Sequence, residues 1–221
     1  MKLIVRNTHK YLSFFISIQL LLWTISGIYF AFNKIENVRG EQYRVQTSSD
    51  YNFQKIEFEI PNAESVNVKK RLGKTIIVAS TKNGMRYFNE EGGALQKISF
   101  DEAKQLVSKQ TSLKPMAVEE IYTSEKGSEY RGRELPLYKV VTRNANDNEI
   151  NAYLNIFTGE VVAIRSAQWR IWDLMWGFHI MDWQERDNID NLLLKIFSIL
   201  ALISSISGIL LFFKIDIKKE A

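Results

Sequence analysis

The sequence predicts an α+β domain, made of an antiparallel sheet and a helix, carried on an antiparallel pair of transmembrane helices. Residues 11–32 contain no charged side chain, and a second apolar run covers residues 192–213 with only Lys195 near its start. Between these runs, short strands with alternating apolar residues are separated by turns that contain glycine, which is typical of hairpins.

Each apolar run is long enough to cross a bilayer. A hydrocarbon core about 30 Å thick needs about 20 helical residues at 1.5 Å each. The first run is too long for the core of a typical signal peptide and has no small-x-small cleavage site before Asn33, so we expect an uncleaved signal anchor. The second run predicts a second span, in which Lys195 extends to the interface.

Basic residues at the two ends predict the orientation. Lys2, Arg6 and Lys10 precede the first span. Three lysines follow the second span: Lys214, Lys218 and Lys219. Cytoplasmic flanks carry an excess of lysine and arginine, and two spans place both termini on one side. We therefore expect residues 1–10 and 214–221 in the cytoplasm and residues 33–191 outside it.

The charge and the cysteine count exclude several classes of function. The chain holds 29 basic and 25 acidic residues, a formal net charge of +4, and the excess lies at the cytoplasmic ends. The outer segment has no basic excess, so we expect no nucleic-acid partner, which would need a basic patch on one domain. The absence of cysteine suits an oxidising compartment and excludes thiolate catalysis and iron–sulfur clusters.

Residues 33–165 predict the outer domain. The expected strands cover residues 65–72, 75–80, 85–88, 94–99, 116–123, 137–143, 150–157 and 161–165. Ser99 and Glu102 form a capping box that starts the one clear helix, which should end before Pro115. Alternation from Ile150 to Ile156 predicts one buried face and one face that lies against water or polar groups.

Several motifs resemble the bacterial PepSY-associated membrane proteins with two spans. "SFDEAKQLVSKQTS" (99–112) and "INAYLNIFTGEVVAIR" (150–165) are similar to the PepSY domain, in which a helix precedes a sheet. "THKYLSFFISIQLLLWTISGIYF" (8–30), "YRGRELPLYKV" (130–140) and "WRIWDLMWGFHIMDW" (169–183) are similar to the flanking and central segments of the family. Trp172 stands where related sequences often carry a histidine.

The resemblance implies a PepSY-like outer domain on a protein of the bacterial cytoplasmic (inner) membrane. PepSY domains accompany peptidases as inhibitory modules, and larger relatives resemble haem-bearing reductases for iron–siderophore complexes. The resemblance therefore implies three functions. The first is a non-enzymatic binding or regulatory module, the second a haem-binding or electron-transfer subunit, and the third a modulator of an extracytoplasmic protease that acts through an exposed sheet edge.

Residues 166–191 predict a helix in the membrane interface followed by an acidic cap. Trp169, Trp172, Trp176 and Trp183 share one helical stripe with His179 if residues 167–183 are helical. Tryptophans at headgroup depth form the aromatic belt of membrane proteins, so we assign the four tryptophans to the interface and His179 to a polar tip. In the alternative interpretation, His179 is an axial ligand of haem b in a pocket that includes Trp176.

One iron cannot take both histidines of a single chain. His9 is expected at the cytoplasmic edge and His179 near the outer edge, separated by about 33 Å of helix. A haem at His179 would need a second copy in a homodimer, a partner protein or an open site. We otherwise expect no cofactor and no metal.

The remaining polar residues favour structural roles. The acidic cap is expected to complement the dipole of the second span, with Arg186 paired to Asp182 or Asp190 at a spacing of four residues. Its residues are Asp182, Glu185, Arg186, Asp187 and Asp190. Small or polar residues at close spacing predict helix packing within the bilayer. They are Ser13, Ser17, Gln19, Ser204 and Gly208.

The sequence contains no convergent catalytic set. Two histidines on opposite membrane faces cannot form a Ser-His-Asp triad, and there is no phosphate-binding loop. We therefore expect no catalytic residues. The expected partners are the lipid bilayer, another membrane or extracytoplasmic protein, and a second copy of the chain.

Overall fold

The computed structural model describes residues 2–45 and 58–213. The chain divides into two compact units. The first combines the segment up to Ile35 with the segment from Arg170 onward, and the second runs from Glu36 to Trp169. Lys214, Lys218 and Lys219, on which part of the predicted orientation depends, lie outside the described residues.

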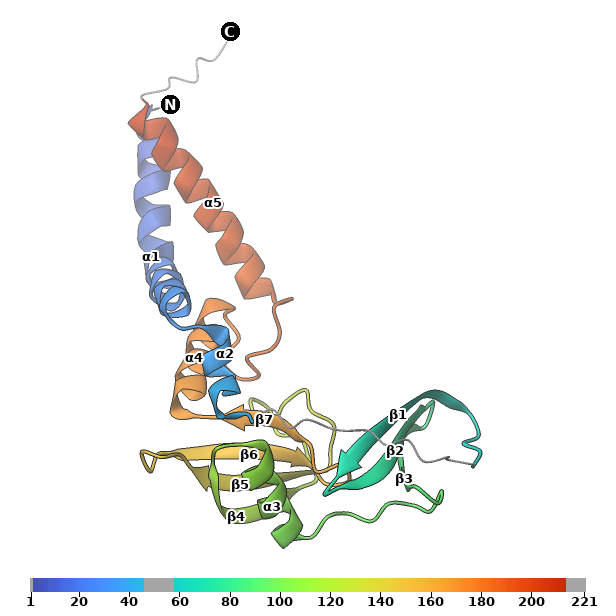
Figure 1. Ribbon diagram of the computed structural model, residues 1–221. Coiled ribbons are helices and arrows are strands. Elements are labelled where there is room, and N and C mark those ends of the chain that lie inside the picture. The colour runs from blue at the N-terminus through green and yellow to red at the C-terminus, as the bar shows by residue number, and fades with distance from the viewer. Residues whose placement is uncertain (1, 46–57, 214–221) are drawn as a thin grey trace. The chain divides into compact units, whose positions relative to one another are not determined.

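The first unit contains three helices: α1 (Lys2–Phe32), most of α4 (Ala167–His179) and α5 (Leu192–Phe212). By length and composition, α1 and α5 could each cross a membrane. They lie side by side and run in opposite directions (Figure 1), because Phe15 stacks on Phe197 while the earlier His9 contacts the later Ser204. The two apolar helices predicted at the ends of the chain are present.

The helix α1 is longer than the predicted span. It begins at Lys2 and covers 31 residues, or about 46 Å at 1.5 Å per residue. It therefore continues past residue 11 through the basic residues Arg6 and Lys10. At the other end of the unit, the side chain of Asn191 caps α5 by accepting a 2.8 Å hydrogen bond from the backbone N–H of Leu194.

The second unit contains two antiparallel sheets in which neighbours in sequence are neighbours in space. The three-stranded sheet consists of β1 (Ala63–Arg71), β2 (Lys74–Thr81) and β3 (Gly84–Asn89). The four-stranded sheet consists of β4 (Lys114–Ile121), β5 (Leu137–Arg143), β6 (Glu149–Asn155) and β7 (Val161–Arg165). A short helix, α2 (Ile35–Val38), and a 3-10 turn, Glu41–Tyr43, precede them. Helices and antiparallel sheets give the α+β arrangement that the sequence predicts.

The helix α3 (Phe100–Gln110) covers one face of the four-stranded sheet. Ser99 caps it, and both hydrogen bonds of the predicted capping box with Glu102 are present. Its buried stripe packs on alternate residues of the sheet. The shared core includes Ala103, Leu106, Val107, Tyr138, Val140, Ile150, Ala152 and Leu154.

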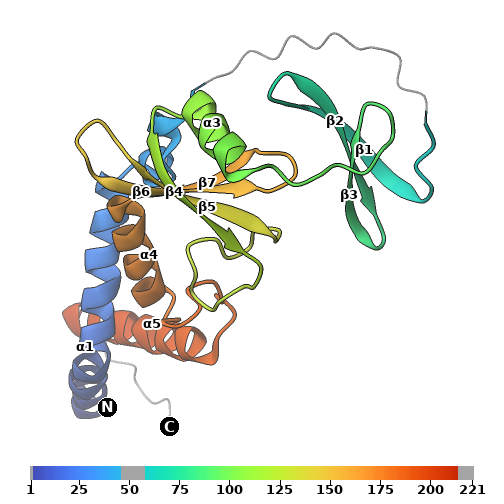
Figure 2. The ribbon, with the colours of Figure 1, turned by 90° about the horizontal axis from the view of Figure 1, so that it is seen from below.

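The opposite face of this sheet is polar and is covered by the loop 122–136. Because successive strand residues point to opposite faces, Lys139, Asn151, Tyr153 and Arg165 project away from α3. Figure 2 shows α3 and the loop between β4 and β5 on opposite sides of the sheet. This polar face is the one that the alternation of residues 150–157 predicts.

Two expected elements differ from the structure. The strand expected at 94–99 is reduced to a single bridge between Ala94 and Phe88, because the segment leaves one sheet and bonds the other through Ile98 N–H and the Ile156 carbonyl. The helix expected at 167–183 ends at His179, and Met181 has a φ of 57°. This left-handed conformation stops an α-helix.

Gly159 provides a test of the core between α3 and the sheet. It has a φ of +69°, and a Cβ added there would lie 2.3 Å from Leu106 Cδ1 in the core. Gly159→Ala should therefore lower the thermal midpoint by several degrees, which corresponds to about 2–4 kcal/mol of strain and overpacking.

Gly132→Ala is the matched control. Gly132 also has a positive φ, +71°, but nothing lies within 4 Å of its added Cβ. It should cost only the backbone strain of about 1 kcal/mol. Equal midpoints for the two variants in a thermal melt would contradict the tight contact with Leu106.

Candidate functional site

His9 lies in a polar contact between α1 and α5. Its Nδ1 is 2.9 Å from Ser207 Oγ and 3.1 Å from the carbonyl oxygen of Ser204. A carbonyl only accepts, so the proton is on Nδ1. Ser13 Oγ is 2.7 Å from Ser204 Oγ, and Gly208 leaves room for the imidazole, since a Cβ there would lie 3.1 Å from His9 Cε1.

His179, in the last turn of α4, contacts α1 further along its length than His9 does. Its Nδ1 is 2.8 Å from Ser26 Oγ, and that hydroxyl donates to the carbonyl of Trp23. The proton is therefore on Nδ1, and Nε2 carries the lone pair. The ring stacks on Trp176 and contacts the edge of Phe30. Burial lowers the pKa of His179, which favours a neutral ring.

Side chains of α1 also donate hydrogen bonds to the last backbone carbonyls of α4. Gln19 Nε2 donates to the carbonyl of Phe178 at 3.1 Å, and Trp23 Nε1 donates to the carbonyl of His179 at 2.6 Å. The last carbonyls of a helix lack partners within the helix. Sequence reasoning assigned Gln19 to packing and did not single out Trp23, although an indole N–H inside an apolar helix signals a need for an acceptor.

The two histidines do not meet. Ser26, the partner of His179, is 17 positions after His9 on the same helix, a separation of about 25 Å. A haem at His179 is compatible with the orientation of its ring, because the bond to Ser26 leaves Nε2 for a ligand. The second axial ligand of such a haem would not come from His9 of the same chain.

The four tryptophans expected at the interface have different surroundings. Trp172 and Trp176 stack on each other with ring centroids 5.6 Å apart, and both contact Phe30. Trp183 is exposed and follows the end of α4. Trp169 is buried in the α+β unit, where the guanidinium of Arg165 lies 4.4 Å from its ring centroid.

The expected acidic cap forms a turn instead of a helical surface. Asp182 accepts hydrogen bonds from the backbone N–H groups of Glu185, Asp187 and Asn188. Arg186 was expected to pair with Asp182 or Asp190, but its guanidinium bonds Asp173 of α4 at 2.7 Å. The reason is that residues 182–190 are not helical, so the i±4 spacing does not apply there.

Of the other residues assigned to helix packing, some lie at the contact of α1 with α5 and one does not. Ser13, Ser204 and Gly208 lie at the contact of α1 with α5. Ser17 is exposed and donates to the carbonyl of Phe14 in its own helix, so it lies away from this contact. Asp190 pairs with Lys195 at the start of α5.

The strongest candidate binding site lies in the α+β unit, on the sheet face opposite α3. A hollow of about 530 Å³ opens between the end of β4, the loop 122–136, and residues of β5 and β6. This volume falls within the range of small-ligand pockets. Its lining includes four glutamates, Glu119, Glu120, Glu125 and Glu129, and one lysine, Lys139. Sequence reasoning missed this site, because the glutamates are spread along a strand and an irregular loop.

Glu129 organises the floor of the hollow. Its carboxylate accepts hydrogen bonds from Asn151 Nδ2 and the Tyr153 hydroxyl, both at 2.9 Å. Burial, and then the charge of Glu129, raise the pKa of the Tyr153 phenol, so it stays a donor. Arg165 Nε donates to the Glu129 carbonyl at 2.8 Å. Burial lowers the pKa of Arg165 to about 10, which still leaves it charged at neutral pH.

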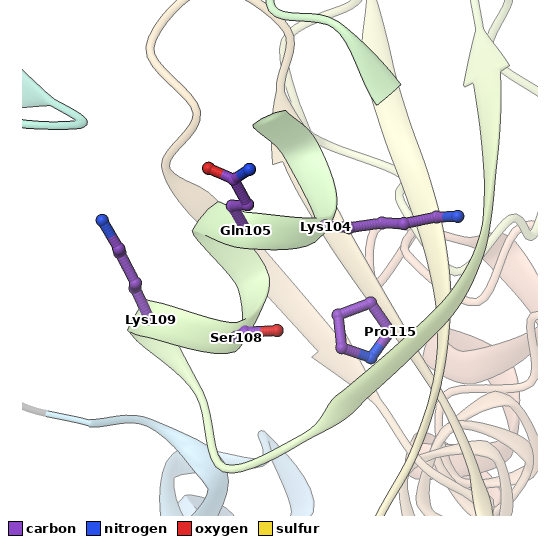
Figure 3. A pocket seen from close by; sticks show the side chains of 5 residues that line it. All are labelled: Lys104, Gln105, Ser108, Lys109 and Pro115. Atoms are coloured by element: carbon purple, nitrogen blue, oxygen red, sulfur yellow. The ribbon is translucent and has the colours of Figure 1, made fainter. Parts of the chain in front are cut away.

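A second hollow, of about 410 Å³, lies between α3 and the start of β4 (Figure 3). Its lining consists of Lys104, Gln105, Ser108 and Lys109 of α3 and of Pro115 in β4. These are side chains on the outer surface of the helix, and the two lysines point in different directions. This hollow offers no fixed set of donors, so we do not treat it as a site.

Among the described residues, no three histidine, aspartate or glutamate side chains are grouped in a way that could hold a metal ion. No family model, curated protein or solved structure matches the chain.

The contact of α1 with α5 can be tested by enlarging one small residue. Ser204 is buried between the helices, so Ser204→Leu should separate them and remove the bond to Ser13. We expect the thermal midpoint in detergent to fall by several degrees, because close approach of membrane helices depends on small residues.

Ser205→Leu is the control, since Ser205 is exposed and bonds only the carbonyl of Ala201 in its own helix. It should leave the midpoint within about one degree of the parent. A larger loss for Ser205→Leu than for Ser204→Leu would reverse the assignment of faces on α5.

Proposed function

We propose that the chain is a two-pass protein of a bacterial cytoplasmic membrane that holds a PepSY-like binding domain at the outer face. In this proposal both termini are cytoplasmic, and the unit Glu36–Trp169 is extracytoplasmic. The protein is a non-enzymatic module that binds or regulates a partner.

The membrane part of the proposal is supported by the surfaces of α1 and α5. Large apolar side chains remain exposed along both helices, for example Phe14, Ile18, Ile199 and Leu202. Exposure of such a large apolar surface to water is unfavourable, whereas the hydrocarbon of a bilayer would cover it. The polar groups between the helices are hydrogen-bonded, as a low-dielectric surrounding requires.

The binding role is carried by one observation, the hollow on the α+β unit. It lies on a sheet face whose polar side chains are fixed by Glu129 and Arg165. Its lining contains carboxylates, phenols and one amide but no histidine or cysteine. Such a lining is suited to recognition by hydrogen bonds and charge.

Labelling of single cysteines tests the orientation, since the chain has no cysteine of its own. Lys82→Cys, in the turn between β2 and β3, should react with a membrane-impermeant maleimide in spheroplasts, whose cytoplasmic membrane is intact. Lys2→Cys should react only after the membrane is opened. The opposite pattern would contradict the proposed orientation, and labelling of both in intact cells would contradict a two-pass arrangement.

A haem-binding subunit is the second candidate function, favoured by the orientation of His179. Ser26 holds Nδ1, and the aromatic rings of Trp176 and Phe30 enclose the imidazole. A bound haem b would supply one-electron transfer. Protein purified from haem-supplemented cells should then show a Soret band that shifts on reduction and is lost in His179→Ala. A colourless parent protein would remove this candidate.

A further inference from the structure

Three arginines gather beside Trp169, the last residue of the α+β unit. The guanidinium carbons of Arg165 and Arg131 lie 4.4 Å and 5.6 Å from the centroid of the Trp169 ring, so they are at most about 10 Å apart, the sum of the two distances. Burial is the largest cause of the lowered pKa of Arg165, and the charges of Arg133 and Arg131 contribute to it. Because such interactions weaken with distance, the three guanidinium groups are near neighbours, and we call them the arginine cluster.

The arginine cluster carries more positive charge than its surroundings neutralise. Glu129 is the carboxylate whose charge acts on Arg165. Glu134, the next acid along the chain, acts on Tyr87 of β3. The ring of Trp169 stabilises a cation by about 0.5–2 kcal/mol but carries no net charge. Three guanidinium groups and one carboxylate therefore leave an excess of two positive charges.

Two of the arginines have donors left for a ligand. Arg165 is 8 % exposed, and its Nε and Nη1 donate to the carbonyls of Glu129 and Ile164. Among the described residues, its Nη2 has no acceptor. This nitrogen is not one of the fully buried atoms without a partner, so it is accessible. Arg133 is exposed, and its guanidinium donates no hydrogen bond to a described residue.

The start of α4 adds to the positive potential. The helix begins at Ala167, its first turn contains no acidic residue, and Trp169 belongs to that turn. The N–H groups at the start of a helix carry a partial positive charge of about half an elementary charge. An anion is therefore favoured beside Trp169 over a cation or a neutral group.

The type of the basic side chains favours phosphate among anions. All three are arginines, whose planar guanidinium groups bind phosphate through two parallel hydrogen bonds. A phosphate group has enough acceptor oxygens to bond two arginines at once. Along the chain, the next residue after Trp169 is Arg170, which begins the segment of the unit that contains α5. The cluster thus borders, in sequence, the helices that the proposed function places in the bilayer.

We propose that the arginine cluster binds a phosphate group, with Arg133, Arg131 and the Nη2 of Arg165 as its donors. The phosphate is carried either by an anionic phospholipid of the outer leaflet or by a soluble phosphate compound. The lipid source rests on the proposed membrane location of α1 and α5, whereas the soluble source does not.

Calorimetry on the full chain in an uncharged detergent tests this proposal. Inorganic phosphate probes the soluble source, and dihexanoylphosphatidylglycerol, below its own micelle concentration, probes the lipid source. Dihexanoylglycerol is the comparator without phosphate, protein-free micelles give the background, and sodium chloride keeps the ionic strength constant, because salt screens such contacts. We expect saturable binding of a phosphate ligand with a Kd between about 10 µM and 1 mM, and none of dihexanoylglycerol.

Four variants connect this binding to the arginine cluster. Arg133→Gln should weaken it at least about tenfold, the effect of losing a charge-assisted hydrogen bond. Arg133→Lys keeps the charge but not the planar group and should weaken it about threefold. Arg86→Gln makes the same charge change at an exposed arginine of β3 that lies over the Phe88 ring, and it should bind like the parent. Lys10→Gln, in α1, should also bind like the parent.

Tighter binding of dihexanoylphosphatidylglycerol than of inorganic phosphate identifies a lipid headgroup, and the reverse order identifies a soluble phosphate. No saturable binding of either at about 10 mM would overturn the proposal. Parent-like binding by Arg133→Gln, or an equal loss in Arg86→Gln or Lys10→Gln, would also overturn it. Arg133→Lys decides in place of Arg133→Gln if the latter does not fold. Cysteine labelling tests the two-pass arrangement without any phosphate ligand, so the two failures are distinguishable.

Discussion

Ser13 of α1 and Ser204 of α5 share a 2.7 Å hydrogen bond between two helices whose other surfaces are largely apolar. Together with His9 and Ser207, this contact sets which turn of α5 lies beside which turn of α1. Apolar packing alone would leave that register weakly defined, because lipid is as apolar as leucine. The hydrogen bonds therefore hold the two ends of the chain together and make the α+β unit an insertion between two helices.

The same helix α1 makes a second set of structural contacts further along its length. Gln19 and Trp23 bond the last carbonyls of α4, and Ser26 orients His179. An unsatisfied carbonyl is costly where water is scarce. Polar side chains of α1 thus contact two helix partners. His9 and Ser13 contact α5 along its first half, and Gln19, Trp23 and Ser26 contact α4 along its second. Removing either set would leave buried polar groups without partners.

The elements that follow from local rules were predictable from the sequence. The capping box at Ser99, the strands at 137–143 and 161–165, and the two apolar helices all depend on short-range patterns. The helix predicted through Trp183 ends early, because the left-handed backbone at Met181 depends on tertiary context. Arg186 finds Asp173 for the same reason, since a turn brings together residues that a helix would separate.

The acidic hollow could not be predicted from the sequence, although the polar sheet face that forms one wall of it could. Alternation of apolar residues in 150–157 indicated a polar face that includes Asn151 and Tyr153. What covers this face is an irregular loop, and Glu129 has no sequence signal that connects it to a strand 22 residues later. Contacts of this kind follow from how the loop folds back, which no local pattern specifies.

The antiparallel contact of α1 with α5 is the central claim, and a disulfide tests it most directly. The double variant Ser13→Cys/Ser204→Cys, in a chain without other cysteines, should form an intramolecular disulfide under mild oxidation in native membranes. The pair Ser17→Cys/Ser205→Cys, at positions exposed away from the contact, should not. No crosslink in the first pair, or crosslinks only between separate chains, would contradict the account.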